Sequence, residues 1–471
     1  MSRSRAARIG APRIWPRAAV AVVASVAAAA VPSLASTPGG SHAVTFVAGS
    51  KTQSANGPRI DLFRTGFANA GEPNIGIAKD GTIYSDVQAK VVRSTNGGKS
   101  WTNITPSTHV TSLDPFLYVD KATSRVYKAD LAGTCQILSW SDDRGATWTD
   151  APAACNQSDH ESLSAAPPVA GLPTVGYPNI LYNCSQTAGY NGYSFASGCA
   201  RSLDGGLTWH PTGSYAFNDP SPYGIAENSG DSGIPGICNG DVGPIFAGPD
   251  GALYVPRGWC GQPWLAISHD GGMTWSRVQV AHNGMNTSVA GGFGLVAPGS
   301  GQSDHEAAVM ADGKGHVFFL WMALDRLPYL AVSRDGGRTF GKPLRVSPPS
   351  VREAWGPALD LDAKGRLAIA YMGSTNSPGK PWTGSYALTT FTGYLGLVTR
   401  PLDSRPVVVS GPVTPASTAL ARGTCGPGRC NDGILDFIDV AIGPAGDVWG
   451  AFVDTAGQVS DELVIGRLRA R

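Results

Sequence analysis

The tetrapeptide SDHE occurs twice in the chain and brings together side chains that could do chemistry. The first copy is Ser158-Asp159-His160-Glu161 and the second is Ser303-Asp304-His305-Glu306. Each copy places two carboxylates beside an imidazole. Such a cluster could provide a general acid and a general base, or it could bind a cation. The duplication suggests that both copies occupy the same place in a repeated structure.

Three interpretations of these clusters compete. As a metal site, the carboxylates and a neutral histidine would hold Ca²⁺ or a transition metal ion. As a catalytic site, one protonated and one ionised carboxyl group would act across a glycosidic bond, with Asp159, Glu161, Asp304 and Glu306 as catalytic residues. As structure, the acidic side chains would accept backbone N–H groups and hold neighbouring repeats in register. No cofactor is predicted to be required, with a structural Ca²⁺ or other divalent ion as the open alternative.

Five eight-residue segments show the repeat that must position these residues. They are STNGGKSW (94–101), SDDRGATW (141–148), SLDGGLTW (202–209), SHDGGMTW (268–275) and SRDGGRTF (333–340). Their shared pattern is that of a tight turn, in which Asp or Asn bonds the turn backbone, glycine takes a positive φ and the aromatic residue anchors the next strand. The pattern resembles the Asp-box, the bacterial neuraminidase repeat (BNR).

An apolar strand, a turn and a second strand precede each box, and further copies of this unit have no box behind them. The copies begin near residues 72, 113, 160, 240, 304, 355 and 436. Repeats of roughly 40 to 60 residues with four short strands each are typical of β-propeller blades. The sequence therefore predicts an all-β fold: a single β-propeller of four-stranded antiparallel blades, with seven blades expected and six as the alternative. The last unit ends after three strands, so the N-terminal strand RIDLFRTG (59–66) is predicted to complete its sheet and close the ring.

The strand order predicts where a functional site lies. The Asp-boxes and the turns after the first strand of each blade fall on one face, and the starts of the first strands fall on the other, nearest the axis. We therefore expect binding residues at this second face. They are Glu72, Asp114, His160, Asp241, Arg257, Trp259, His305, Trp355 and Asp436.

The resemblance to sialidases implies a specific site. In that family three arginines bind the sugar carboxylate, a tyrosine paired with a glutamate is the nucleophile, and an aspartate is the acid/base. The first arginine normally lies in a Phe/Tyr-Arg-Ile/Leu-Pro motif ahead of the first box. This sequence departs there, because Arg59 and Arg64 in GPRIDLFRTG are not in that motif, and seven repeats differ from the usual six blades.

The N-terminal segment predicts export. Five arginines precede an apolar run and a small-residue cleavage site, so residues 1–35 are predicted to be a signal peptide, 36–58 a linker segment and 59–471 the propeller domain. Without the signal the chain is slightly acidic, which gives no basic field for nucleic acid. No segment is long and apolar enough to span a bilayer, and we expect a secreted monomer.

Eight cysteines in an exported chain predict disulfides. Short local loops would pair Cys135 with Cys155, Cys184 with Cys199, Cys238 with Cys260, and Cys425 with Cys430, although the sequence alone leaves many other pairings open.

The functional prediction is a secreted, sialidase-like Asp-box propeller that acts on carbohydrate as a glycoside hydrolase of exo-sialidase-like type, through its acidic face. The alternative is a non-catalytic propeller scaffold that binds carbohydrate or protein, since fold alone does not set the reaction.

Overall fold

The computed structural model describes residues 45–48, 59–88, 90–107, 112, 114–133, 135–155, 159–187, 196–218, 242–259, 262–283, 307–378, 388–415, 417–422, 437–459 and 461–469. The chain divides into Met1–Ser41, which lies outside these residues, and His42–Arg471, which contains every strand described. The described residues form strands and turns, with no helix among them.

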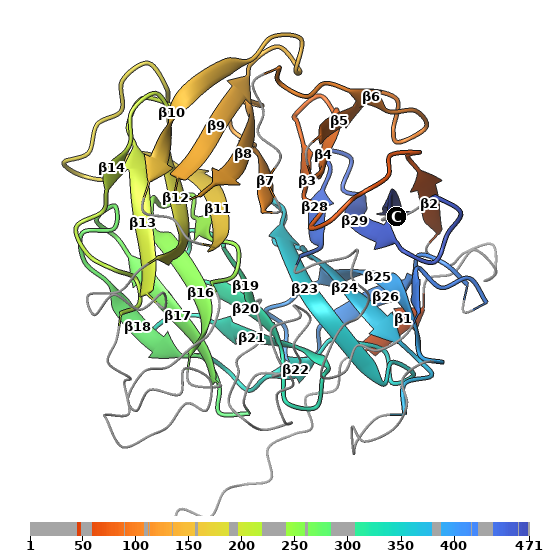
Figure 1. Ribbon diagram of the computed structural model, residues 1–471. Helices are drawn as coiled ribbons and strands as arrows, with labels where there is room; N and C mark the ends of the chain where they lie inside the picture. Colours follow the sequence, from red (N-terminus) through yellow and green to blue (C-terminus); the bar gives the residue numbers. More distant parts are fainter. Residues whose placement is uncertain are drawn as a thin grey trace, which may run out of the picture. The chain divides into compact units, whose positions relative to one another are not determined.

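The strands form seven antiparallel sheets, which are the blades of a β-propeller (Figure 1). Blade one is β3 (Ile75–Ile77), β4 (Ile83–Val87), β5 (Lys90–Ser94) and β6 (Thr102–Asn103); blade two is β7 (Pro115–Val119), β8 (Val126–Ala132), β9 (Cys135–Ser141) and β10 (Thr149–Cys155). Blade three is β11 (Asp159–Ala166), β12 (Ile180–Thr187), β13 (Ala196–Ser202) and β14 (His210–Pro211); blade four is β15 (Phe246–Ala247), β16 (Leu253–Trp259), β17 (Gln262–Ser268) and β18 (Ser276–Gln279).

The remaining blades complete the ring. Blade five is β19 (Ala307–Ala311), β20 (Val317–Met322), β21 (Pro328–Ser333) and β22 (Leu344–Arg345); blade six is β23 (Glu353–Leu361), β24 (Leu367–Ser374), β25 (Thr390–Thr399) and β26 (Val407–Pro412). Blade seven is β28 (Asp439–Ile442), β29 (Val448–Asp454), β30 (Glu462–Leu468) and β2 (Ile60–Arg64). The prediction of a seven-bladed all-β propeller is therefore confirmed.

The N-terminal strand closes the ring as predicted. β2 pairs antiparallel with β30, from Ile60 opposite Leu468 to Arg64 opposite Val464. Arg64 fixes this register through ion pairs with Asp454 and Glu462. The first strand of the propeller therefore lies in the last blade, and this pairing closes the ring.

Blade six carries two additional strands. β1 (Thr45–Ala48) pairs in parallel with β26, and β27 (Ala421–Arg422) pairs with β25. β1 lies within the segment 36–58 that the sequence suggested as a linker, so part of that segment extends a blade.

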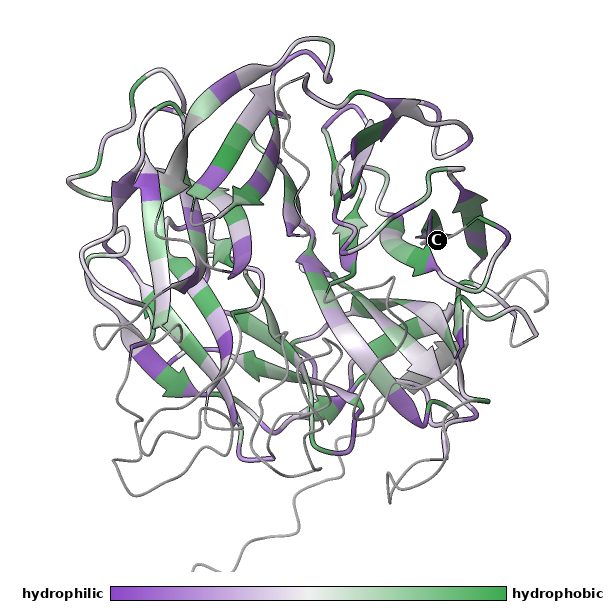
Figure 2. Cartoon of the chain, in the orientation of Figure 1, coloured by the Kyte–Doolittle hydropathy of each residue, from purple (hydrophilic) through white to green (hydrophobic). Residues whose placement is uncertain are grey.

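Apolar residues fill the spaces between blades, and Figure 2 shows them along the strands. The inner strand of each blade packs against the inner strand of the next, and β28 of blade seven packs against β3 of blade one. One core cluster joins residues of blades six, seven and one, which seals the ring. The others fill the remaining interfaces between neighbouring blades.

The Asp-boxes are hydrogen-bonded turns on the outer part of the blades. In the second box Asp143 accepts the N–H and hydroxyl of Thr147, while the hydroxyl of Ser141 accepts the N–H of Gly145. Boxes three to five repeat this set of bonds. In the first box Asn96 takes the place of the aspartate and its amide bonds Ser100. The five boxes share their spacing because these hydrogen bonds stabilise the turn.

The glycine at the fifth position of the box, Gly145 in box two and Gly337 in box five, serves two purposes. Both glycines have a positive φ, which is unfavourable for residues that carry a Cβ. A Cβ on Gly145 would also lie 2.4 Å from Ile104 Cδ1 in blade one, and one on Gly337 would lie 2.4 Å from Ile267 Cδ1 in blade four. Glycine therefore lets each turn pack against the preceding blade.

Two of the predicted disulfides are confirmed. Cys135 pairs with Cys155 across β9 and β10, and Cys184 pairs with Cys199 across β12 and β13. The other four cysteines lie outside the described residues. No helix in the described ranges has the length and hydropathy to cross a membrane.

Candidate functional site: an acidic cluster on the top face

The two faces of the ring differ in what they carry. We call the face where the inner strands begin the top face, and the face with the Asp-boxes and the turns after the inner strands the bottom face. Among the described predicted site residues, Glu72, Asp114, the segment 159–161 and Trp355 lie at or next to inner-strand starts, at the top face.

A β-bulge shapes the start of blade three. Asp159 pairs with Gln186 and Ser162 with Cys184, so His160 and Glu161 together lie opposite one residue of β12. His160 has a φ of 51°, a conformation that non-glycine residues rarely adopt. Bulges of this kind redirect a side chain and recur beside active sites. Residues 159–161 thus form a distorted strand start and not a regular ladder.

The ring of His160 reaches another blade. It packs edge-on against Phe437, immediately before the inner strand of blade seven, with ring centroids 5.0 Å apart. His160 also lies 3.8 Å from the carboxylate of Asp159, measured from Nε2 to Oδ2. The side chain is 3% exposed, so it is held between two blades that are not neighbours in the ring.

Glu161 is a buried carboxyl group whose two oxygens find no hydrogen-bond partner in the described part of the chain. Burial raises its pKa well above the usual value of 4.5; Asp114 and Asp159 raise it further, and Lys128 acts in the opposite direction. A carboxyl group with a raised pKa keeps its proton to a higher pH than an ordinary carboxyl group does, and it can then act as a proton donor.

Lys128 is the cation that lies near Glu161 and its neighbouring carboxylates. It is fully buried on β8, and its ammonium bonds Asp130 at 2.8 Å and the backbone oxygen of Gln88 at 3.2 Å. Asp86, on β4 of blade one, is equally buried. Burial raises the pKa of Asp86 to about 8, although Lys128 and the N–H of Asn74 lower it. We call Asp86, Asp114, Asp130, Asp159, Glu161 and Lys128 the acidic cluster.

The acidic side chains of blades five to seven have a different environment. Glu353, at the start of β23, forms a buried ion pair of 2.8 Å with Arg326 and also accepts the hydroxyl of Ser377. Burial raises the pKa of Glu353, and Arg326 and Ser377 counteract the shift. Asp454 and Glu462 share the guanidinium of Arg64. Arginines pair with these three carboxylates.

The arginines do not form a shared anion site with each other in the bonds that the structure shows. Arg257 is fully buried, bonds the hydroxyl of Ser197 and stacks over Phe217. Arg326 is committed to Glu353. In these contacts Arg257 and Arg326 have different partners.

The other predicted binding residues occupy varied places. Trp259 and Trp355 are almost completely buried in core clusters between blades. Glu72 is buried with a φ of 49° just before β3. Five predicted site residues lie outside the described residues, so the structure does not place them beside the acidic cluster or apart from it. They are Asp241, Asp304, His305, Glu306 and Asp436.

Side chains other than the predicted site residues hold neighbouring blades in register. Each accepts the backbone N–H of the next blade's inner strand: Asn74 from Leu117, Tyr118 from Ala165, Ser162 from Ile245, Asp360 from Ile442 and Asp439 from Ile75. Glu161 accepts no such bond. Inter-blade registration therefore does not explain Glu161.

Sequence reasoning did not identify Lys128. Its signal is a lysine within a strand whose neighbours are all buried, VYKADLA, where an isolated charge requires a partner. In the described ranges no group of three or more His, Cys, Asp or Glu side chains is arranged to hold a metal ion. The divalent-ion alternative stays a prediction.

Comparison with known proteins identifies the repeat. Residues 266–277 match the family model described as the BNR/Asp-box repeat. The chain is an Asp-box β-propeller. No curated protein sequence matches it significantly.

Solved structures resemble this Asp-box propeller at low identity. Virginiamycin B lyase from Staphylococcus aureus is 11% identical, with a TM-score of 0.48 over 88% of this chain and 100% of that chain. An intramolecular trans-sialidase from Ruminococcus gnavus is 14% identical, with a TM-score of 0.39 over 86% and 97% of the respective chains. An α-L-arabinofuranosidase from Fusarium graminearum is 14% identical, with a TM-score of 0.39 over 72% and 97%. At these values the likeness says nothing about the activity of this chain.

Proposed function

We propose that this Asp-box propeller is a glycoside hydrolase that binds carbohydrate at its top face, with Glu161 as the general acid. The environment of the Glu161 carboxyl group carries the proposal. It is buried, lacks a hydrogen-bond partner in the described part and lies among carboxylates that raise its pKa. Carboxyl groups kept protonated in this way are typical proton donors in glycosidases.

Asp159 is the partner carboxylate in this mechanism. Its side chain is 46% exposed and lies two residues from Glu161 on the same bulged strand, so water can reach it. Glu161 gives its proton to the glycosidic oxygen as the bond to the sugar carbon breaks. Asp159 stabilises the positive charge that develops on the sugar and takes a proton from the attacking water. The net reaction adds one water molecule across the glycosidic bond.

The experiment is a hydrolysis screen with the purified chain, using a sialoside and a panel of neutral aryl glycosides. Release of the aryl group from one of them, lost in Glu161→Gln, would support the proposal. Turnover that Glu161→Gln leaves unchanged would overturn the role of Glu161. Carbohydrate binding without turnover of any panel member by the wild type would instead favour the non-catalytic scaffold.

We also propose that the chain is exported before it acts. The predicted signal in residues 1–35 and the two disulfides support this proposal, because disulfides persist mainly in oxidising compartments. N-terminal sequencing of the protein from the culture medium is expected to begin near Ser36. Retention of the full chain inside cells would contradict export.

A further inference from the structure

A second site lies along the central channel. A cavity of about 820 Å³ is lined by the inner strands of all seven blades and by the turns that follow them. Its size falls within the range of small-molecule sites in proteins. The residues of the acidic cluster are not among those that line it, so it is separate from the site of the proposed hydrolysis.

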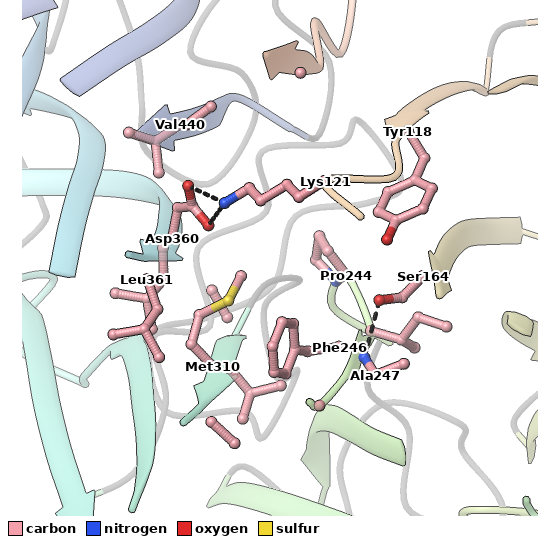
Figure 3. Close-up of a pocket in the computed structure, with 18 of the residues that line it drawn as sticks. Tyr118, Lys121, Ser164, Pro244, Phe246, Ala247, Met310, Asp360, Leu361 and Val440 are labelled. Carbon is pink, nitrogen blue, oxygen red and sulfur yellow. Dashed lines mark hydrogen bonds and ion pairs between the residues drawn. The ribbon is translucent and has the colours of Figure 1, made fainter. Parts of the chain in front are cut away.

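The walls of this cavity are mainly apolar. Figure 3 shows Tyr118 from blade two, Phe246 from blade four, Met310 from blade five and Leu361 from blade six around it. The lining extends to Lys314 and Lys364, which are exposed on turns of the bottom face. A ligand could therefore reach the cavity from the face opposite the acidic cluster.

One polar contact crosses the cavity. Lys121, on the turn after β7 in blade two, extends to Asp360 on β23 in blade six (Figure 3). Its ammonium lies 2.5 and 2.6 Å from the two carboxylate oxygens. The aspartate side chain is 8% exposed and also accepts the N–H of Ile442, whereas the lysine side chain is 53% exposed.

This contact shows what chemistry the cavity accepts. A primary ammonium already lies on a fixed, buried carboxylate, at the end of a flexible side chain that comes from the other side of the channel. Asp439, on the neighbouring inner strand, adds a second, half-buried carboxyl group that accepts the N–H groups of Ile75 and Val440. A half-exposed lysine contributes little through such a pair and can move away from it.

We propose that the cavity binds a primary organic ammonium with an apolar body, whose charged group replaces that of Lys121 on Asp360. The body of the ligand packs against the apolar walls, where aromatic rings favour a nearby cation. Lys121 then acts as a built-in competitor that holds the site until the ligand arrives. This second site does not depend on the proposed hydrolysis.

Isothermal titration calorimetry with 2-phenylethylammonium chloride tests this proposal. Lys121→Ala removes the competitor and is expected to bind the probe at least tenfold more tightly than the wild type. Asp360→Asn keeps an acceptor for the Ile442 N–H but loses the charge, and is expected to lose binding. Lys342→Ala, at an exposed lysine that does not line the cavity, is the control and should bind as the wild type does.

Neutral 2-phenylethanol separates the charge from the apolar body, and its affinity should not differ between the wild type and Lys121→Ala. Equal affinity of the wild type and Lys121→Ala for the ammonium would overturn the proposal. So would undiminished binding by Asp360→Asn. Thermal unfolding of each variant checks the fold, and the comparison of wild type with Lys121→Ala stands without the Asp360 variant.

Discussion

Two sides of the top face use acidic residues in opposite ways. In blades six and seven, three carboxylates are paired with arginines: Glu353 has Arg326, and Asp454 and Glu462 share Arg64. In blades one to three, a single buried lysine, Lys128, lies among several carboxyl groups. Both groups of residues lie at the top face of the propeller.

This difference separates residues that support the ring from residues available for chemistry. An ion pair with an arginine stabilises the ionised carboxylate and commits it to the fold. When carboxyl groups outnumber the nearby cations, burial and mutual repulsion keep some of them protonated. The surplus of acid in blades one to three therefore marks the candidate site. Glu353, Asp454 and Glu462, which are paired with arginines, serve as its internal control.

The largest expected effect separates Glu161 from Glu353. On a substrate found in the screen, Glu161→Gln should lower kcat by about 10²- to 10⁴-fold, because the amide cannot donate the proton. Glu353→Gln should leave kcat near the wild-type value at temperatures where it is folded. Equal losses in the two variants would show that the two sides do not differ in function.

Removal of the cation on each side provides the second comparison. Lys128→Met and Arg326→Met should each lower the free energy of unfolding by about 3 to 5 kcal/mol, because each leaves a buried carboxylate without its ion pair. Chemical denaturation measures both changes.

Only Lys128→Met should also change the pH dependence of hydrolysis. Lys128 lowers the pKa of Glu161, so its loss raises that pKa. A general acid acts while it is protonated, and the alkaline limb of the pH–rate profile should therefore move to higher pH. A shift in Arg326→Met of the same size would argue that the acidic cluster is not a separate unit.

A third comparison concerns stability and pH. Asp86 has a pKa of about 8 in the folded chain against 3.8 in the reference state, so the folded state retains a proton that the unfolded state loses. Stability from this group is complete below pH 3.8 and is lost as the pH rises through about 8. Asp86→Asn should therefore become more stable relative to the wild type across this window, by up to about 1.4 kcal/mol per pH unit. Urea unfolding of the wild type and of Asp86→Asn at a series of pH values measures this gain.

The smallest expected effect lies outside both regions. Ser202→Ala in the third Asp-box removes the acceptor of the Gly206 N–H and should lower the free energy of unfolding by about 1 kcal/mol. Hydrolysis by this variant should be unchanged at temperatures below its unfolding transition. A loss of kcat in the folded variant would mean that the Asp-boxes do more than stabilise turns.

The sequence was sufficient for the fold because each blade repeats a local signal. The Asp-box turns, the inner-strand units and the local cysteine pairs 135/155 and 184/199 all depend on short-range spacing, and the ring closure followed from one missing strand in the last unit. Contacts between segments far apart in the sequence could not be predicted in this way. The ion pair between Lys121 and Asp360 joins residues that no local pattern relates.

The site could be predicted only in part for the same reason. Asp159, His160 and Glu161 attracted attention through their residue types, but their bulge and the partners around them depend on β12 and β8. The burial of Lys128 and the raised pKa of Asp86 come from packing between blades one and two. Which acids are paired and which are in surplus is a property of the folded ring.

The central claim is that burial holds the pKa of the Glu161 carboxyl group well above its usual value of 4.5 in the folded chain. Nuclear magnetic resonance of the protein labelled with ¹³C at the glutamate side-chain carboxyl carbon, recorded across the pH range for the wild type and Glu161→Gln, measures this directly. The resonance that disappears in the variant should titrate with a pKa well above 4.5. A missing resonance that titrates at or below 4.5 would contradict the account.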